Sequence, residues 1–229
     1  MPADAPRLKI ERTKAFGGEV VPYDRVTEDR DAIAREICEN RNAAYIHPFD
    51  DPDVIAGQGT AGLEMMEQAA ALGAVPDIVL VGASGGGLIG GISLAVKEKS
   101  PSTQIWSVEP AGFDDLARSL QKGSREKNAA LAGSICDALL AVTPGELTFE
   151  MAKKNLAGGL SVTDEEAKTA VRFAFRELKL VVEPGGAVSL AAILAKKLPF
   201  EGKTVAAVLS GGNIDPSMFA EIIVDKHAA

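Results

Sequence analysis

The 229-residue chain has few of the residues from which metal and redox centres are commonly built. Its two cysteines, Cys38 and Cys136, are far apart and form no C-x-x-C pair, and its only histidines are His47 and His227. Zinc sites need such residues at close spacing, so no zinc centre is expected. Two unpaired cysteines are typical of a reducing compartment, so we expect a cytoplasmic protein.

Long hydrophobic runs and basic surfaces are also missing. No stretch of about 18 apolar residues occurs, so no membrane span is expected, and residues 1–21 lack the apolar segment of a signal peptide. The chain has one tryptophan, two tyrosines and a formal net charge of −8. An acidic chain with so few aromatic residues is a poor candidate for binding nucleic acid.

Short apolar runs alternate with helical patterns along most of the chain. Strands are expected at 77–81, 104–108 and 205–209, and helices at 88–99, 163–180 and 217–224. Thr163 and Glu166 have the spacing of a capping box at the start of one helix. The repeated order of strand, glycine turn and helix predicts an α/β fold, a parallel sheet with helices on both faces. Ligands of such sheets bind at the carboxyl ends of the strands.

The N-terminal part differs from the rest. A charged helix at 5–16 and a strand at 19–23 suggest that the chain starts inside an α/β unit. We expect a boundary near residue 46, with 1–46 as the remainder of a small αβ domain and 47–229 as the large α/β domain. The prolines and glycines of 47–60 suggest a crossover into the large domain, followed by a helix at 60–72.

Residues 81–93, VGASGGGLIGGIS, contain six of the 23 glycines. Gly85, Gly87 and Gly90 satisfy G-x-G-x-x-G, and Glu109 follows at a strand end, which is the pattern of a dinucleotide-binding turn. However, three residues separate the strand from Gly85. The resulting wider cup of N–H groups, with the Ser84 hydroxyl, suits one compact phosphate. A purely structural turn is a third interpretation.

Four stretches in order carry a resemblance to a known family: HPFDDPDVIAGQGT (47–60), VGASGGGLIGG (81–91), VEPGGAVSLAA (182–192) and LSGGN (209–213). They resemble the serine/threonine dehydratase and serine racemase family. Its members are pyridoxal 5′-phosphate (PLP) enzymes of the tryptophan-synthase-β fold type, fold type II. The resemblance covers essentially the whole chain.

The resemblance implies a set of cofactor-binding residues. The phosphate would lie on the loop of Ser84, Gly85, Gly86 and Gly87, although relatives more often have a fourth glycine at the position of Ser84. Ser210 would face the pyridine nitrogen and Glu183 would lie beside the ring. A neutral hydroxyl does not keep that nitrogen firmly protonated, which favours β-elimination over fuller carbanion chemistry. Taken alone, Ser210 could equally be a loop hydroxyl bonded to its own backbone.

The stretch VEPAGFDD resembles the family's divalent-cation site. Glu109 and Asp115 would supply carboxylates and Phe113 a backbone carbonyl, and such oxygen ligands suit Mg²⁺ or Ca²⁺. The alternative interpretation is a solvated acidic turn.

Two family motifs have no counterpart here. Relatives carry a lysine in a motif like SFKxRGA, which forms a Schiff base with PLP, and a loop like SSGNHGQ that holds the substrate carboxylate. No lysine in this chain has such surroundings, so no catalytic residue is identified. The chain resembles the C-terminal two-thirds of a dehydratase, lacking the N-terminal portion of the fold. We therefore expect it to be inactive alone.

The activity that the resemblance implies is β-elimination of a hydroxy amino acid, threonine or serine, to a 2-oxo acid and ammonia. Serine racemization and 3-hydroxyaspartate elimination use the same parts of the site and stay open. The complete protein is expected to be a homodimer. Two alternatives remain: an NAD-dependent oxidoreductase that uses Gly85, Gly87 and Gly90, and a non-catalytic remnant that binds phosphate.

Overall fold

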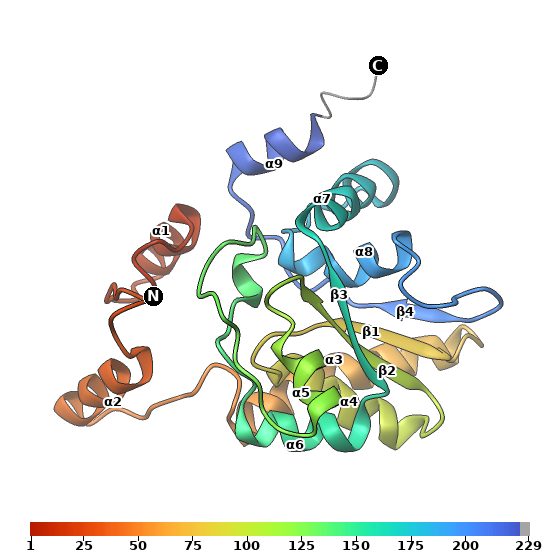
Figure 1. Ribbon diagram of the computed structural model, residues 1–229, viewed down its shortest axis with the longest axis horizontal. Coiled ribbons are helices and arrows are strands. Elements are labelled where there is room, and N and C mark those ends of the chain that lie inside the picture. Colours follow the sequence, from red (N-terminus) through yellow and green to blue (C-terminus); the bar gives the residue numbers. More distant parts are fainter. Residues whose placement is uncertain (225–229) are drawn as a thin grey trace.

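A computed structural model describes residues 1–224, so His227 and the last residues of the expected large domain lie outside the described part. Its centre is a four-stranded parallel sheet in the order β3-β2-β1-β4 (Figure 1). The strands are β1 (Ile78–Gly82), β2 (Gln104–Pro110), β3 (Gly158–Val162) and β4 (Val205–Ala207). Strand β3 was not expected, because its two glycines give no strand signal.

Helices cover both faces of the sheet, as the sequence predicts. Ile78 and Leu80 of β1 pack on one face with α7 (Asp164–Phe173) and α8 (Val188–Leu194). Val79 and Val81 pack on the other with α3 (Pro52–Ala71), α4 (Gly87–Lys99), α5 (Asp115–Lys122) and α6 (Glu146–Asn155). Because all five β1 residues are buried, the strand reads as a continuous apolar run.

Helix α3 begins earlier than expected, so the interpretation of 47–60 as a crossover was wrong for its second half. The Asp51 side chain accepts hydrogen bonds from the backbone N–H groups of Asp53 (2.8 Å) and Val54 (3.1 Å), and Pro52 opens the helix. Gly59 and Gly62 lie within α3 where it packs against α4. A Cβ on Gly62 would lie 3.0 Å from the Ile92 Cα, so glycine there permits close helix packing.

Residues 1–46 form a polar appendage at one side of the sheet (Figure 1). Its helices, α1 (Arg7–Ala15) and α2 (Arg30–Arg41), contain no buried residues. The prediction of a strand at 19–23 is wrong. Among residues 1–224, this segment pairs only through an isolated bridge between Pro2 and Tyr23. The Leu8 N–H and the Arg12 guanidinium donate to Asp215 and Asn213, across from α1.

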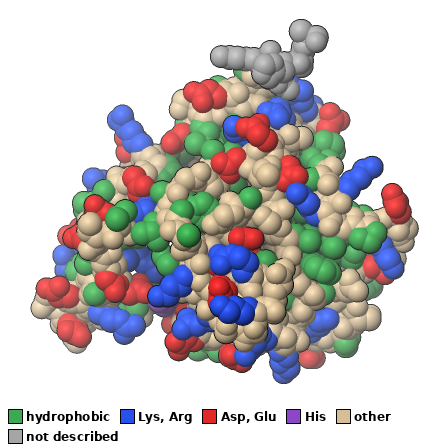
Figure 2. Space-filling model, viewed as in Figure 1, with side chains coloured by type: hydrophobic (Ala, Val, Ile, Leu, Met, Phe, Trp, Pro, Cys, Tyr) green, Lys and Arg blue, Asp and Glu red, His purple; other side chains and the backbone are tan. Residues whose placement is uncertain are grey.

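The remaining elements are short. They are the 3₁₀ turns η1 (Asp137–Leu139) and η3 (Gly185–Ala187), the π turn η2 (Ala174–Leu178), which continues α7, and α9 (Pro216–Ile223). No helix in residues 1–224 is long and apolar enough to span a bilayer. Acidic and basic side chains are interspersed over the face shown in Figure 2.

The capping box predicted at Thr163 is present and gives a first test of the fold. The Thr163 hydroxyl accepts from the Glu166 N–H (3.2 Å), and the Glu166 carboxylate accepts from the Thr163 N–H (2.7 Å). We expect Thr163→Ala to lower the free energy of unfolding by about 1 kcal/mol. Thr169→Ala, on the exposed side of α7, is the control and should change it by less than about 0.5 kcal/mol. Equal effects in urea denaturation would contradict the capping role.

Candidate functional site

The order of strands brings two predicted site segments together. The chain leaves β1 into the loop Ala83–Gly86 before α4, and it leaves the neighbouring strand β4 toward Ser210. The carboxyl ends of parallel strands lie at the same edge of a sheet. The loop of Ser84 to Gly87 and Ser210 therefore line one cavity of about 500 Å³. Lys9, Tyr23, Arg25 and Arg30 close it from the N-terminal part.

The glycine loop presents unpaired backbone N–H groups. Gly85, Gly86 and Gly87 are buried, and within residues 1–224 the N–H groups of Ser84, Gly85 and Gly86 donate no hydrogen bond. Gly86 is the N-cap of α4 with φ of +98°. Buried donors without partners at a helix N-terminus are suited to an anion, because unsatisfied N–H groups are costly and the helix dipole favours negative charge.

Ser84 adds a side-chain donor to this loop. Its Oγ accepts a hydrogen bond from the Ala141 N–H at 2.8 Å, which fixes the oxygen and leaves the hydroxyl proton free to donate.

The other side of the loop is closely packed. Thr148 Oγ1 donates to the Gly85 carbonyl at 2.6 Å, and a Cβ on Gly86 would lie 2.8 Å from Thr148 Oγ1. A Cβ on Gly85 would overlap the ring of Phe49, a residue that sequence reasoning did not single out. Packing thus accounts for the bare backbone, but a purely structural turn does not account for the unpaired N–H groups.

The structure brings Glu183 close to Ser210, because Glu183 contacts Gly211, the next residue in the chain. Ser210 is exposed to the cavity, and within residues 1–224 its hydroxyl makes no hydrogen bond to another protein group, so it is not tied to its own backbone. The Glu183 N–H donates to the Gly211 carbonyl at 2.9 Å, and the Glu183 carboxylate lies against Gly211. Glu183 ends no strand, because Val181 and Val182 pair with no strand and the segment leads directly into η3.

Lys9 is a cavity residue that sequence reasoning missed. Its Nζ lies 3.1 Å from Asp137 Oδ2 and 3.3 Å from Glu183 Oε2. Burial alone would lower the pKa of Lys9, but the charges of Glu183 and Asp137 outweigh burial and raise it. No signal in the sequence marks Lys9, because it sits in a charged helix with no buried face.

The predicted cation ligands Glu109 and Asp115 are both fully buried, so the interpretation as a solvated acidic turn is wrong. The Glu109 carboxylate accepts from the Leu116 (3.0 Å) and Ala117 (2.8 Å) N–H groups at the start of α5. Burial, and then the charge of Asp115, raises the pKa of Glu109 well above its usual value. Glu109 is fully buried and does not line the cavity beside the glycine loop, so it does not face a ribose there, which argues against the dinucleotide interpretation.

Asp115 has an unsatisfied oxygen. Its Oδ1 accepts from Asn128 Nδ2 at 2.6 Å, while its Oδ2 is buried without a partner. Burial raises the pKa of Asp115 to about 6. Phe113, the third predicted ligand, is buried in the turn between them. Across residues 1–224 no group of three or more His, Cys, Asp or Glu side chains could hold a metal, so a site here would rest on two carboxylates and a carbonyl.

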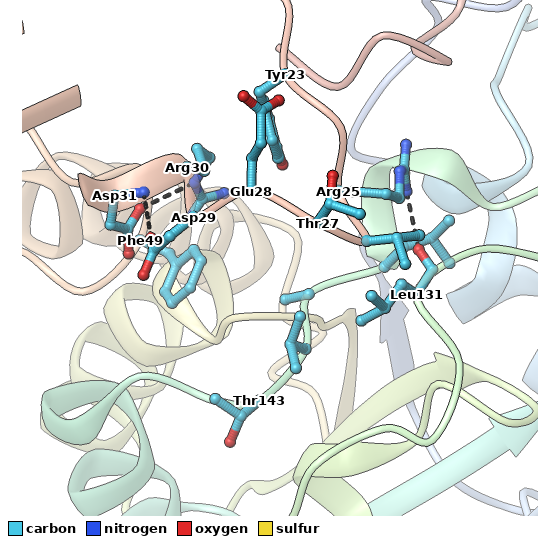
Figure 3. A pocket seen from close by; sticks show the side chains of 14 residues that line it. Tyr23, Arg25, Thr27, Glu28, Asp29, Arg30, Asp31, Phe49, Leu131 and Thr143 are labelled. Atoms are coloured by element: carbon cyan, nitrogen blue, oxygen red, sulfur yellow. Dashed lines mark hydrogen bonds and ion pairs between the residues drawn. The ribbon is translucent and has the colours of Figure 1, made fainter. Parts of the chain in front are cut away.

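A second cavity of about 530 Å³ shares several lining residues with the first (Figure 3). Tyr23, Arg25, Arg30 and Phe49 line both, so the cleft continues beyond the glycine loop. Arg25 Nη1 donates to the Leu131 carbonyl at 3.0 Å, which joins the N-terminal part to the main body.

Comparison with known proteins identifies the family of this chain. A family model described as pyridoxal-phosphate dependent enzyme matches residues 1–211. The chain belongs to this family. L-threonine ammonia-lyase of Thermotoga maritima is 39% identical over 225 residues, covering 97% of this chain and 54% of the relative. L-threo-3-hydroxyaspartate ammonia-lyase of Pseudomonas sp is 38% identical, and serine racemase of Schizosaccharomyces pombe 37%, each covering 97% of this chain and 68% of the relative.

Solved structures of this family share the fold. The T.th. threonine deaminase matches with a TM-score of 0.83 and 42% identity over 90% of this chain and 67% of that one. Maize serine racemase matches with a TM-score of 0.86 and 34% identity over 96% and 67%. The expected type II fold is confirmed. The chain spans about half to two-thirds of the length of these relatives.

The loop can be tested through Gly86. We expect Gly86→Asp to weaken PLP binding by at least about tenfold, because a carboxylate in the cup repels a phosphate. Gly86→Ala is the matched control. It imposes the same backbone strain at φ of +98° and the same approach to Thr148 without the charge. The measurement is a PLP titration on variants with comparable melting curves. Equal binding by the Asp and Ala variants would contradict an anion site here.

Proposed function

We propose that these residues, together with the lysine-bearing segment of the family, catalyse PLP-dependent elimination of ammonia from a small hydroxy amino acid, giving a 2-oxo acid. The observation that supports this proposal is the set of unpaired N–H groups at the start of α4, which lie in the same cavity as the Ser210 hydroxyl. Threonine and serine are the proposed substrates. The similarity to relatives named for threonine and for 3-hydroxyaspartate supports elimination, and the similarity to serine racemases keeps racemization as the second candidate.

The residues present fit the cofactor in charge and in donor set. The N–H groups of Ser84, Gly85 and Gly86 and the Ser84 hydroxyl would hold the phosphate, and Ser210 would face the pyridine nitrogen. When bound, PLP supplies an electron sink for negative charge at the substrate α-carbon. Ser210 would limit that sink, because a neutral hydroxyl offers no fixed negative charge that would keep the ring nitrogen protonated.

Other residues of the cavity would exclude water from the phosphate site and place charge beyond the loop. Phe49 packs against the glycine loop and lines both cavities, so it keeps water from one side of the phosphate site. Arg25 and Arg30 give the cleft two cations beyond the loop. Each is already paired with a carboxylate of the N-terminal part, Arg25 with Asp4 (2.7 Å) and Arg30 with Asp31 (2.9 Å), so a substrate carboxylate would have to share or replace that partner.

We also propose that Glu109, Asp115 and the Phe113 carbonyl bind Mg²⁺ or Ca²⁺. The unpartnered, buried Asp115 Oδ2 supports this, because a cation would satisfy it and relieve the repulsion between the two carboxylates. The unpaired Cys38 and Cys136 are consistent with our expectation of a cytoplasmic protein, and a homodimer remains our expectation for the complete chain.

The cation site predicts a stability effect. At a hundred times the dissociation constant, bound Mg²⁺ or Ca²⁺ should stabilise the fold by about 2.7 kcal/mol, or roughly 5–10 °C in Tm. Asp115→Asn should abolish this rise, whereas Asp114→Asn, one residue earlier and only part-buried, should retain it. Unchanged melting of the wild-type chain on adding either cation would rule the site out.

Activity is tested in two arms with the 229-residue chain. Alone with PLP, it should release no substantial ammonia from threonine or serine, because covalent PLP catalysis needs a lysine amine at the aldehyde carbon and a base within about 3 Å of the α-proton. Fusing a relative's N-terminal segment, with its lysine motif, should restore ammonia and 2-oxo acid release. The same fusion with that lysine changed to alanine is the control. Robust turnover in the first arm would contradict the assignment.

A further inference from the structure

The carbonyl group of Gly85 is turned away from the cavity that the glycine loop lines. It accepts hydrogen bonds from the Thr148 hydroxyl at 2.6 Å and from the Gly145 N–H at 3.1 Å. Both donors lie at the start of α6, and neither residue lines the cavity. Thr148 is only 1% exposed, so this contact is made inside the protein.

The direction of this carbonyl sets the direction of the next N–H group. Peptide bonds among the described residues are trans, so the Gly85 C=O and the Gly86 N–H point in opposite directions from one planar unit. Gly86 lines the cavity, and within residues 1–224 its N–H donates no hydrogen bond. Rotation of this peptide plane would replace a donor in the cup by a carbonyl oxygen, which repels an anion. The Thr148 hydroxyl therefore holds the plane in the orientation that suits a phosphate.

Thr148 is in turn placed by a carboxylate from a distant segment. The Asp50 side chain accepts hydrogen bonds of 2.9–3.1 Å from the first three N–H groups of α6, those of Glu146, Leu147 and Thr148. Such groups have no partner within their own helix. The N-cap residue, Gly145, has no side chain to satisfy them, and a Cβ there would overlap the Asp50 carboxylate. Asp50 thus supplies the cap that α6 lacks.

Two helix N-termini meet at the glycine loop, and they are satisfied differently. Asp50 satisfies the N–H groups that begin α6, whereas those of the loop before α4 face the cavity. The segment that carries Asp50 also touches the loop, because a Cβ on Gly87 would lie 2.9 Å from the Phe49 Cα. His47 Nδ1 accepts from the Asp50 N–H at 2.8 Å and holds this segment in a turn. The segment, the start of α6 and the loop are therefore fixed as one unit.

We propose that Thr148 and Asp50 are positioning residues of the phosphate site. Thr148 holds the Gly85 carbonyl out of the cup, and Asp50 holds Thr148. This inference rests on the proposed cofactor site and names two residues outside the cavity that set its affinity for a phosphate. Neither residue contacts the anion, so each acts through the peptide plane between Gly85 and Gly86.

The first experiment removes the hydroxyl. Inorganic phosphate is titrated onto the full chain at a temperature where every variant is folded. We expect Thr148→Val to weaken phosphate binding by at least about tenfold, because a methyl group cannot donate to the Gly85 carbonyl. Thr148→Ser keeps the hydroxyl and should bind within about twofold of the wild type. Thr163→Ala, which removes a cap on the opposite face of the sheet, should also bind like the wild type, so that lost stability alone does not explain the result.

The amide proton of Gly86 reports the orientation directly. Phosphate should shift its nuclear magnetic resonance downfield in the wild type and in Thr148→Ser, because the N–H donates to the anion. The shift should be absent in Thr148→Val, since the plane is no longer held.

Asp50 provides a test of sign that separates charge from position. Asp50→Asn removes the negative charge but keeps an oxygen that can accept from the Thr148 N–H, so it should bind phosphate at least as well as the wild type. Asp50→Ala removes both. Electrostatics alone predicts that Asp50→Ala strengthens phosphate binding, whereas the positioning role predicts that it weakens it.

The outcomes distinguish this inference from the proposed function. If the wild type binds phosphate and PLP, and Thr148→Val and Asp50→Ala bind them as well or better, the positioning role is wrong and the cofactor site stands. If the wild type binds neither compound, both are overturned. Asp50→Ala decides the case if Thr148→Val does not fold.

Discussion

The parallel pairing of β1 with β4 is the constraint on which the candidate site depends. Leu80 lies opposite Ala207, so both strands end at nearly the same level. The glycine loop begins a few residues after one strand and Ser210 lies a few residues after the other. A shift in register would separate the N–H groups of the loop from the Ser210 hydroxyl. Three consecutive parallel pairs, from Ile78 with Val205 to Leu80 with Ala207, set this register.

Glycine serves two separate purposes in the 81–93 segment. At Gly85 and Gly86 it leaves room for Phe49 and Thr148 while presenting N–H groups to the cavity. Gly91 is buried, and a Cβ there would overlap the backbone of α3. Gly91 therefore allows α4 to pack closely against α3, while Gly85 and Gly86 form the loop at the N-terminus of α4. A G-x-G-x-x-G match alone does not distinguish ligand binding from close helix packing.

The N-terminal part is attached in a different way from the rest. Since α1 and α2 contain no buried residue, residues 1–46 are held to the α/β body by polar contacts such as Lys9 with Asp137 and, from the segment between the two helices, Arg25 with the Leu131 carbonyl. Partly exposed ion pairs each contribute about 0–1 kcal/mol, far less than apolar packing. One wall of the cleft is therefore held to the α/β body mainly by polar contacts.

The sequence by itself determined the elements whose signals are local. The apolar runs of β1 and β2, the capping box at Thr163 and the ordered motifs around Gly85, Glu183 and Ser210 predicted the fold class, and the family followed from those motifs. The glycines of α3 and β3 misled local reasoning, because their role depends on what packs against them. Only the tertiary structure decided that Glu109 caps α5 inside the protein, that Phe49 covers the loop and that Lys9 reaches the cavity. Each of these depends on residues distant in the chain, and a periodic pattern carries no information about which distant side chains fold together.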